Sequence, residues 1–201
     1  MRLSTQTKLD PALIIDCHDY GEIGVRSGDL DGDGQSELVI AQGVDGFQKR
    51  GSTGGYPHEK TIHCLTALDQ QGSILWQHGT PIRGDNERKY HGPPPLLVHD
   101  VDGDGKAEVV VMTVDKNLPL IRLYDGATGE LKAERETGAT YNILPVNLRG
   151  LGKRDILIGT GLSVVFAYDD NLEPIWEWVS VYGGGHEHAA ADVDGSGKDD
   201  L

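Results

Sequence analysis

The chain has 201 residues, and its 32 acidic against 18 basic residues give a formal net charge of −14 at pH 7. So acidic a surface argues against binding to nucleic acid or to anionic membranes, and the length suffices for a sizeable core. No apolar run approaches the roughly 18 residues of a membrane span, so we expect no membrane insertion.

An Asp- and Gly-rich motif recurs along the chain. It reads DLDGDGQSELVI from Asp29, DVDGDGKAEVVV from Asp100, NLRGLGKRDILI from Asn147 and DVDGSGKDDL from Asp192. The intervals are 71, 47 and 45 residues, so a repeat of one length fits if the first copy carries an insertion. Such a period is typical of repeat architectures.

Each repeat contains the pattern of four strands. A strand leads to the aspartate motif, a β-branched run follows it, and a hairpin comes next: LTALDQQGSILWQHG, IRLYDGATGELKAER or VFAYDDNLEPIWEWV. We therefore predict an all-β fold, a β-propeller or propeller fragment of four-stranded antiparallel blades. A β-sandwich of similar strands is the alternative, and the regular repeat argues against it.

The repeats also define the expected domains. We expect residues 1–21 to be an N-terminal tail or part of a preceding blade, and residues 22–201 to form about three complete blades plus the start of a fourth. Residues 43–61 are expected to form a long loop after the second strand. Closed propellers have about four to eight blades, so we interpret the chain as a fragment of a larger propeller.

The repeated motif has the residues of a calcium loop. Carboxylates at positions 1, 3 and 5 converge on one hard cation, a backbone carbonyl at position 7 can join them, and glycines permit the sharp turn. With the acid at position 9, the candidate ligands are Asp29, Asp31, Asp33, the Gln35 carbonyl and Glu37; Asp100, Asp102, Asp104, the Lys106 carbonyl and Glu108; and Asp192, Asp194, Ser196, the Lys198 carbonyl and Asp200. We expect calcium to brace the blades there; the alternative is an empty turn with solvated aspartates.

Two comparisons limit this prediction. An EF-hand needs a glutamate at position 12 and a following helix, whereas Ile40 and Val111 occupy that position within strand-like runs. In the third motif Asn147, Arg149 and Leu151 replace the aspartates, so we expect that loop to keep the turn and lack the metal.

The pattern D-x-D-G-D-G-x-x-[DE] followed by three apolar residues resembles the FG-GAP or VCBS repeat over residues 22–201. That resemblance implies calcium-bearing propeller blades. The hairpins are also similar to quinoprotein-type blade repeats, whose tryptophan packs between blades. The resemblance thus implies that Trp76 and Trp176 belong to the core.

Histidine, tyrosine and arginine recur in the segments that precede each blade's first strand, where propeller connections gather around the central channel. The candidates are His18, Tyr20 and Glu22; Arg83, Arg88, Lys89, Tyr90 and His91; Tyr141 and Asn142; and Tyr182, His186, Glu187 and His188. Taken singly, each histidine is more simply a solvated loop residue. An additional possibility is zinc bound by His186 and His188, and His58 and His63 are expected to be surface or strand residues.

The segments GGGHEHAAADVDGSGKDDL and YHGPPPLLVHDVDGDGKAEVV are similar to the rhamnogalacturonan and ulvan lyase group of propeller polysaccharide lyases. This resemblance implies β-elimination at a uronic acid. By position, His91 and either His186 or His188 are assigned to base or carboxylate neutraliser. Tyr90 or Tyr141 is assigned to acid or base, and Arg88 to the substrate carboxylate.

Two functions therefore remain open: a lyase acting on a uronic-acid glycan, and a non-catalytic propeller that binds glycans or proteins. Weak loop calcium sites need extracellular calcium, which favours an extracellular or periplasmic location, although MRLSTQTKLD lacks the apolar core of a secretory signal. Cys17 and Cys64 are compatible with a disulfide or with two thiols.

Overall fold

The computed structural model describes residues 14–20, 24–45, 60–81, 95–116, 118–138, 140–160, 164–179 and 188–201. Within these ranges the chain is all-β, apart from one 3-10 turn, η1 (His18–Tyr20). None of the described segments is a helix long and apolar enough to cross a membrane. The predicted boundary at residues 21 and 22 lies outside the described part.

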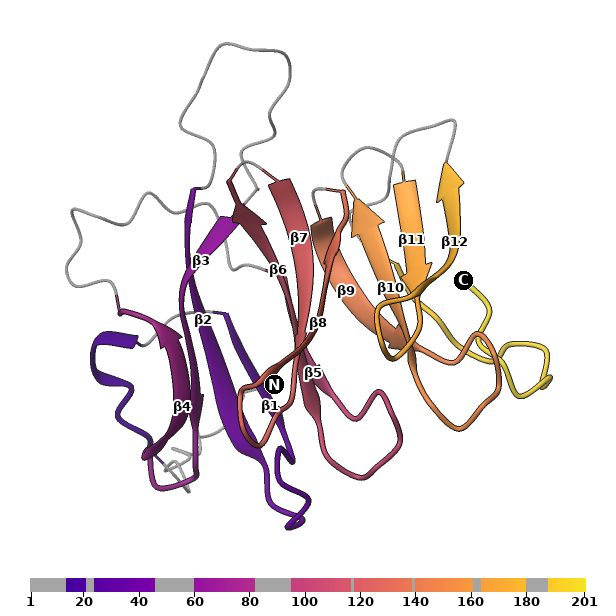
Figure 1. Ribbon diagram of the computed structural model, residues 1–201. Helices are drawn as coiled ribbons and strands as arrows, with labels where there is room; N and C mark the ends of the chain where they lie inside the picture. The colour runs from indigo at the N-terminus through magenta and orange to yellow at the C-terminus, as the bar shows by residue number, and fades with distance from the viewer. Residues whose placement is uncertain are drawn as a thin grey trace, which may run out of the picture.

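Twelve strands form three antiparallel four-stranded sheets, each in sequential order (Figure 1). Blade 1 contains β1 (Val25–Gly28), β2 (Glu37–Asp45), β3 (Lys60–Leu68) and β4 (Ile74–Gly79). Blade 2 contains β5 (Leu96–His99), β6 (Glu108–Asp115), β7 (Leu118–Tyr124) and β8 (Leu131–Glu136). Blade 3 contains β9 (Thr140–Val146), β10 (Asp155–Thr160), β11 (Val164–Tyr168) and β12 (Pro174–Val179).

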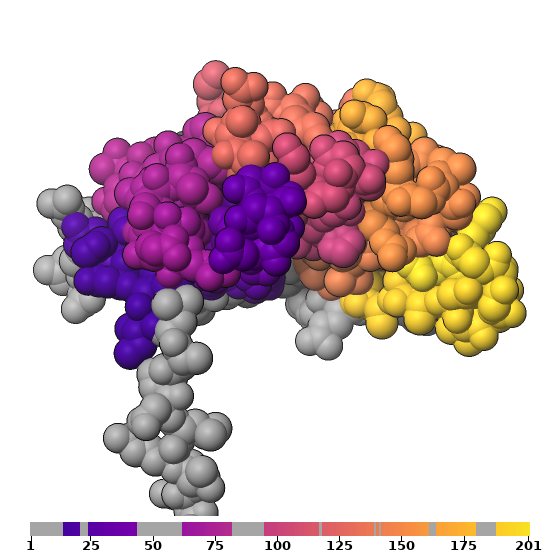
Figure 2. Space-filling model, turned by 90° about the horizontal axis from the view of Figure 1, so that it is seen from below, coloured from indigo at the N-terminus to yellow at the C-terminus, as the bar shows by residue number. Residues whose placement is uncertain are grey.

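The three sheets stand face to face as blades of a β-propeller. The first strands adjoin, β1 beside β5 and β5 beside β9, so they form the inner side, and β4, β8 and β12 form the outer rim. Figure 2 shows the blades and the C-terminal segment following one another along an arc. The predicted fold class is thus confirmed.

The second strand of each blade is covered on both faces. Every residue of β10, and every residue of β6 except Asp115, is buried, because a neighbouring sheet or segment packs against each side. This explains why EVVVMTV and DILIGT are not alternating polar and apolar patterns. The predicted loop 43–61 was too long at both ends, because Val44 and Asp45 pair with Thr61 and Lys60 in the β2–β3 ladder.

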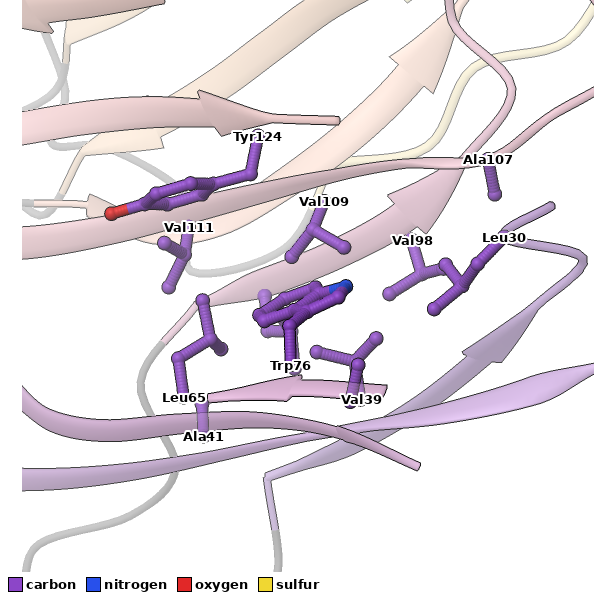
Figure 3. Packing of buried hydrophobic residues seen from close by; sticks show 12 residues of the cluster. Leu30, Val39, Ala41, Leu65, Trp76, Val98, Ala107, Val109, Val111 and Tyr124 are labelled. Atoms are coloured by element: carbon purple, nitrogen blue, oxygen red, sulfur yellow. The ribbon is translucent and has the colours of Figure 1, made fainter. Parts of the chain in front are cut away.

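The first interface, between blades 1 and 2, is built around Trp76 on the outer strand β4. Its indole lies among the buried side chains of this cluster (Figure 3). Trp76 is 8% exposed, and its Nε1 donates a hydrogen bond to the Gly126 carbonyl at 2.6 Å. The indole lies over Gly129, where an added Cβ would come within 2.7 Å of the ring. The middle strands β2 and β3 contribute the small Ala41 and Ala67 to this cluster. The predicted core position of Trp76 is confirmed.

In the second interface, between blades 2 and 3, the large side chains come from different strands than in the first. Ala133 takes the register position of Trp76, because it pairs with Leu123 as Trp76 pairs with Ala67. Larger side chains fill other parts of the cluster: Met112 on β6, Leu123 on β7 and the fully buried Leu172 in the β11–β12 turn. Leu172 has φ of 61° and occupies the hairpin position of Gly129, whose φ is 74°.

Two other predictions concern Trp176 and the two cysteines. Trp176 is half-buried and packs against the cluster of Leu157, Val165 and Ala167, so it belongs to the margin of the core. Cys17 and Cys64 are both free thiols, which answers the question left open by the sequence.

Candidate functional site

The aspartate motifs connect the first and second strands of the blades, and a strand follows each of the first three. The first aspartate organises the loop around itself: Asp29 Oδ1 accepts from the Gly32 amide at 2.7 Å, and Oδ2 accepts from the Gly34 amide at 2.8 Å. Gly32 and Gly34 have φ of 83° and 85°, a conformation that glycine adopts without strain. The prediction of a strand–loop–strand unit instead of an EF-hand is confirmed.

In loop one (residues 29–37), the carboxylates converge. Oxygen atoms of Asp29, Asp31 and Asp33 lie within 4.8 Å of one another. Glu37 is buried, and its Oε2 accepts from the Leu30 amide at 2.8 Å. Burial, together with repulsion from the three aspartates, raises the pKa of Glu37. Among the described residues, no basic side chain forms an ion pair with this cluster, so a divalent cation would relieve the repulsion.

Loop two (residues 100–108) contains a cation of its own. Asp100, Asp102 and Glu108 offer oxygens within 4.8 Å of one another. Lys132 Nζ, from β8, lies 2.9 Å from Asp102 Oδ2 and 2.8 Å from Glu108 Oε1. Burial opposes the charge on this ammonium, but the hydrogen bonds to Glu108 and Asp102 outweigh it and raise the pKa of Lys132. The ammonium therefore supplies part of the positive charge that an ion would bring.

Loop three (residues 147–155) uses arginine in the corresponding place. Arg149 Nε donates to Asp155 Oδ1 at 2.7 Å, and its Nη2 donates to Asp170 at 3.3 Å. Lys153 Nζ lies 2.6 Å from the same Asp170. The turn is kept, as predicted, with Gly150 at φ of 69°. The acid at motif position 9 therefore has a basic partner in both loops: Arg149 pairs with Asp155 in loop three, and Lys132 pairs with Glu108 in loop two.

Loop four (residues 192–200) brings together the same motif positions as loop two, namely 1, 3 and 9. Asp192, Asp194 and Asp200 offer oxygens within 4.8 Å of one another. Asp200 Oδ2 accepts from the Val193 amide at 3.1 Å, the bond that Glu37 makes in loop one. The other candidate ligands remain predictions: Ser196, Asp104, and the carbonyls of Gln35, Lys106 and Lys198.

Backbone hydrogen bonds join each loop to the next. The Ala107 amide donates to the Asp29 carbonyl at 2.7 Å, the Arg154 amide to the Val101 carbonyl at 2.8 Å, and the Asp199 amide to the Asn147 carbonyl at 2.8 Å. Figure 2 views this end of the molecule. The loops therefore form a continuous row across the blades.

Of the candidate catalytic residues, His188 lies beside the inner strand β9, away from the aspartate loops. His188 is half-buried, and its Nδ1 lies 3.3 Å from Asn142 Oδ1 on the inner strand β9. This contact between the ring and the Asn142 amide orients the imidazole beside β9. Asn142 precedes Asn147 of loop three by five residues, about 17 Å of strand at 3.3 Å per residue. The aspartate loop of blade 3 and Asn142 are therefore at different places along β9.

The other sequence candidates are less fully placed. Tyr141 lies in β9, and four more lie outside the described residues: Arg88, Tyr90, His91 and His186. His63 is exposed on β3, as expected, with Nδ1 2.6 Å from the Thr80 carbonyl, whereas His58 is outside the described residues. Sequence reasoning missed Lys132, because nothing in a hairpin 24 residues after Glu108 marks it as a partner of the loop.

The blades and their loops define the class of the protein as a β-propeller segment with aspartate-rich loops at one end. Its family follows from comparison: the chain belongs to rhamnogalacturonan lyase family 11, whose C-terminal domain model matches residues 16–120. The looser of the two resemblances seen in the sequence is thereby confirmed. The FG-GAP or VCBS resemblance remains a prediction.

Curated relatives and solved structures agree with this membership. The chain is 27% identical to rhamnogalacturonan endolyase YesW of Bacillus subtilis (strain 168) over 237 aligned positions, which cover 90% of this chain and 37% of YesW. It is 32% identical to rhamnogalacturonan exolyase YesX of the same organism over 96 positions, 48% of this chain and 14% of YesX. The chain thus spans well under half of these relatives.

Two solved structures share the fold. The structure of the exotype rhamnogalacturonan lyase YesX matches with a TM-score of 0.58 at 23% identity, covering 87% of this chain and 37% of that one. The Bacillus licheniformis rhamnogalacturonan lyase PL11 matches with a TM-score of 0.59 at 23% identity, covering 87% and 38%. At this identity the likeness shows the fold alone.

Proposed function

We propose that this chain is part of an enzyme that cleaves a uronic-acid-containing polysaccharide of the rhamnogalacturonan type by β-elimination. The observation that carries the proposal is membership of lyase family 11 over residues 16–120. The endolyase and exolyase relatives support it. His188, held by Asn142 at the inner strand, adds a base at the end of the blades where the channel connections lie.

The reaction requires three groups at the site: a base, an acid and a positive charge. A base removes the C5 proton of the uronic acid, the C–H electrons form the C4–C5 double bond, and the C4–O bond breaks as an acid protonates the leaving oxygen. Positive charge beside the C6 carboxylate stabilises the intermediate. We assign His188 to base or neutraliser; Arg88, Tyr90, His91, Tyr141 and His186 are the further candidates. Because the chain is acidic overall, an anionic substrate requires a local positive patch.

The test follows the unsaturated product by its absorbance near 235 nm, with rhamnogalacturonan as substrate and the full-length protein as enzyme. His188→Ala should lower kcat/KM at least about 100-fold, while His63→Ala, a matched change at an exposed strand residue, should leave it unchanged. If the wild-type protein binds the polysaccharide but releases no unsaturated product, the non-catalytic glycan-binding propeller is the better description.

We also propose that loops one, two and four bind calcium outside the cytoplasm. The converging carboxylates support this, as does the appearance of Arg149 where loop three lacks them. Calcium should raise Tm, chelation should lower it, and magnesium should substitute poorly because it prefers octahedral sites that keep bound water. An unchanged Tm after chelation would contradict the bracing function.

A further inference from the structure

The imidazole of His188 packs directly on the backbone of Gly159, a buried residue of β10. A Cβ at Gly159 would lie 2.3 Å from His188 Cε1, 2.4 Å from His188 Nδ1 and 2.6 Å from Asn142 Oδ1. These separations are far below van der Waals contact. Any larger residue at position 159 would therefore compete with the imidazole for the same space.

The backbone conformation does not explain the glycine. Gly159 is not among the residues with positive φ, and it pairs with Asn142 in the antiparallel ladder between β9 and β10. Glycine weakens the interior of a strand and often marks a place where another group approaches closely. The feature of Gly159 that the structure uses is therefore the space beside its Cα.

The corresponding place in the other two blades is filled by a side chain. Counted from the first residue of each aspartate motif, Gly159 corresponds to Ala41 and Met112. The hydrogen bonds agree with this count: the amides of Ala41 and Met112 donate to carbonyls five residues before their motifs, and Asn142 stands at the same offset opposite Gly159. The three positions are therefore structurally equivalent.

His188 stands where the other repeats have a core residue. It lies four residues before its motif, at the position of Leu96 and Ile143. Leu96 is 4% exposed in the cluster that contains Ala41, and Ile143 is 8% exposed in the cluster that contains Met112. At the first two interfaces, two apolar residues thus fill these positions. Where blade 3 meets the segment 188–201, an imidazole and a glycine fill them.

The differences in blade 3 all favour the imidazole. A polar group placed in an apolar contact is unfavourable unless it finds a polar partner. Asn142 Oδ1 provides that partner at 3.3 Å from His188 Nδ1, and Gly159 provides the volume. Packing alone does not account for the glycine, because an alanine or a methionine fills the same position in the other blades.

We propose that Gly159 is a positioning residue for His188 in the lyase centre. The space beside its Cα, together with Asn142, fixes the imidazole at the inner strand. This inference rests on the proposed function, in which His188 serves as base or carboxylate neutraliser. A reacting group displaced by about 1 Å can lose about 100-fold in rate, so a single methyl group at position 159 should be enough to impair the reaction.

The first experiment compares two glycine variants of the full-length protein with rhamnogalacturonan as substrate. Gly159→Ala should lower kcat/KM about 100-fold, mainly through kcat. Its Tm should stay the same or rise, because the added methyl group meets side chains and alanine suits a strand better than glycine. Gly138→Ala is the matched control: a Cβ there would lie 2.9 Å from Thr160 Cγ2, in the same blade, and should leave kcat/KM unchanged.

Two further measurements connect the effect to the imidazole. Gly159→Ala should cause no additional loss of kcat/KM in the His188→Ala background, because the ring that it displaces is already absent. Carbethoxylation by diethyl pyrocarbonate, followed by mass spectrometry without substrate, should modify His188 faster in Gly159→Ala, since the displaced ring is no longer half-buried. The exposed His63 is the internal reference. If Gly159→Ala lowers Tm, adding His188→Ala should recover part of the loss.

The outcomes separate this inference from the proposed function. Unchanged His188 reactivity in folded Gly159→Ala would overturn the inference, as would wild-type kcat/KM in that variant. An equal loss of activity with and without His188 would also overturn it, because the glycine would then act on another group. A full-length protein without lyase activity would overturn the proposed function, while faster modification of His188 in Gly159→Ala would still support the placement of the ring by Gly159.

Discussion

The two blade interfaces are filled by large side chains at different positions. The first interface uses one large outer side chain, Trp76, over the small Ala41, Ala67 and Gly129. The second has the small Ala133 on its outer strand, and larger residues elsewhere in the cluster: Met112 on β6, Leu123 on β7 and Leu172 in the β11–β12 turn. The space between two blades can therefore be filled from the outer strand of one blade, or from the middle strands together with the hairpin of the next blade.

The loop ends of the two interfaces differ in a parallel way. The first interface joins loop one, where only carboxylates meet among the described residues, to loop two, which contains Lys132. The second joins loop two to loop three, where Arg149 neutralises the buried Asp155. We therefore expect the first interface to depend on an added ion more than the second.

The largest expected loss of stability follows from substitution of Trp76. Trp76→Ala removes the centre of the first interface and should cost about 3–5 kcal/mol of unfolding free energy, measured by urea unfolding. Trp178→Ala is the matched control, because Trp178 is 58% exposed and should change stability by less than about 0.5 kcal/mol. Equal losses in the two variants would contradict the central position of Trp76.

Substitutions of Leu172 test the stability of the second interface in the same way. Leu172→Ala should cost about 2–4 kcal/mol, because a fully buried leucine is lost. Leu172→Gly should be as stable or about 1 kcal/mol more stable than Leu172→Ala, since the φ of 61° favours glycine. Both values come from the same denaturation series. A glycine variant clearly less stable than the alanine variant would show that backbone strain contributes nothing here.

The smallest expected effect is at Lys132. Lys132→Met should destabilise the calcium-free protein by about 1–3 kcal/mol, because buried Glu108 loses its cation. Added calcium should recover most of this loss, and calcium affinity at loop two should increase. Thermal melts and calorimetric titrations measure both effects. Lys116→Met, at an exposed turn, is the control; a loss that calcium does not restore would separate Lys132 from the metal loops.

The sequence predicted the architecture because the fold repeats. Aspartate motifs at near-constant intervals and strand pairs around short turns are local signals, so four-stranded blades could be inferred without tertiary information. The interior positions of Trp76 and the strands that follow the motifs were predictable for the same reason.

What the sequence did not predict depends on contacts between distant segments. Lys132 lies on a hairpin strand, and only folding brings it to Glu108, so the motif alone suggested an ion there and nothing else. Arg149 was expected to exclude a metal, but its pairing with Asp170 depends on the fold of the β11–β12 turn.

The hydrogen bonds between neighbouring loops also allow the packing of one repeat against the next to be measured. The amides of Ala107, Arg154 and Asp199 have acceptors in the preceding repeat and not in their own. Their exchange with deuterium therefore reports when one repeat separates from its neighbour, while strand amides report when a sheet itself opens. Docking and internal folding of the repeats can thus be timed separately in a single spectrum.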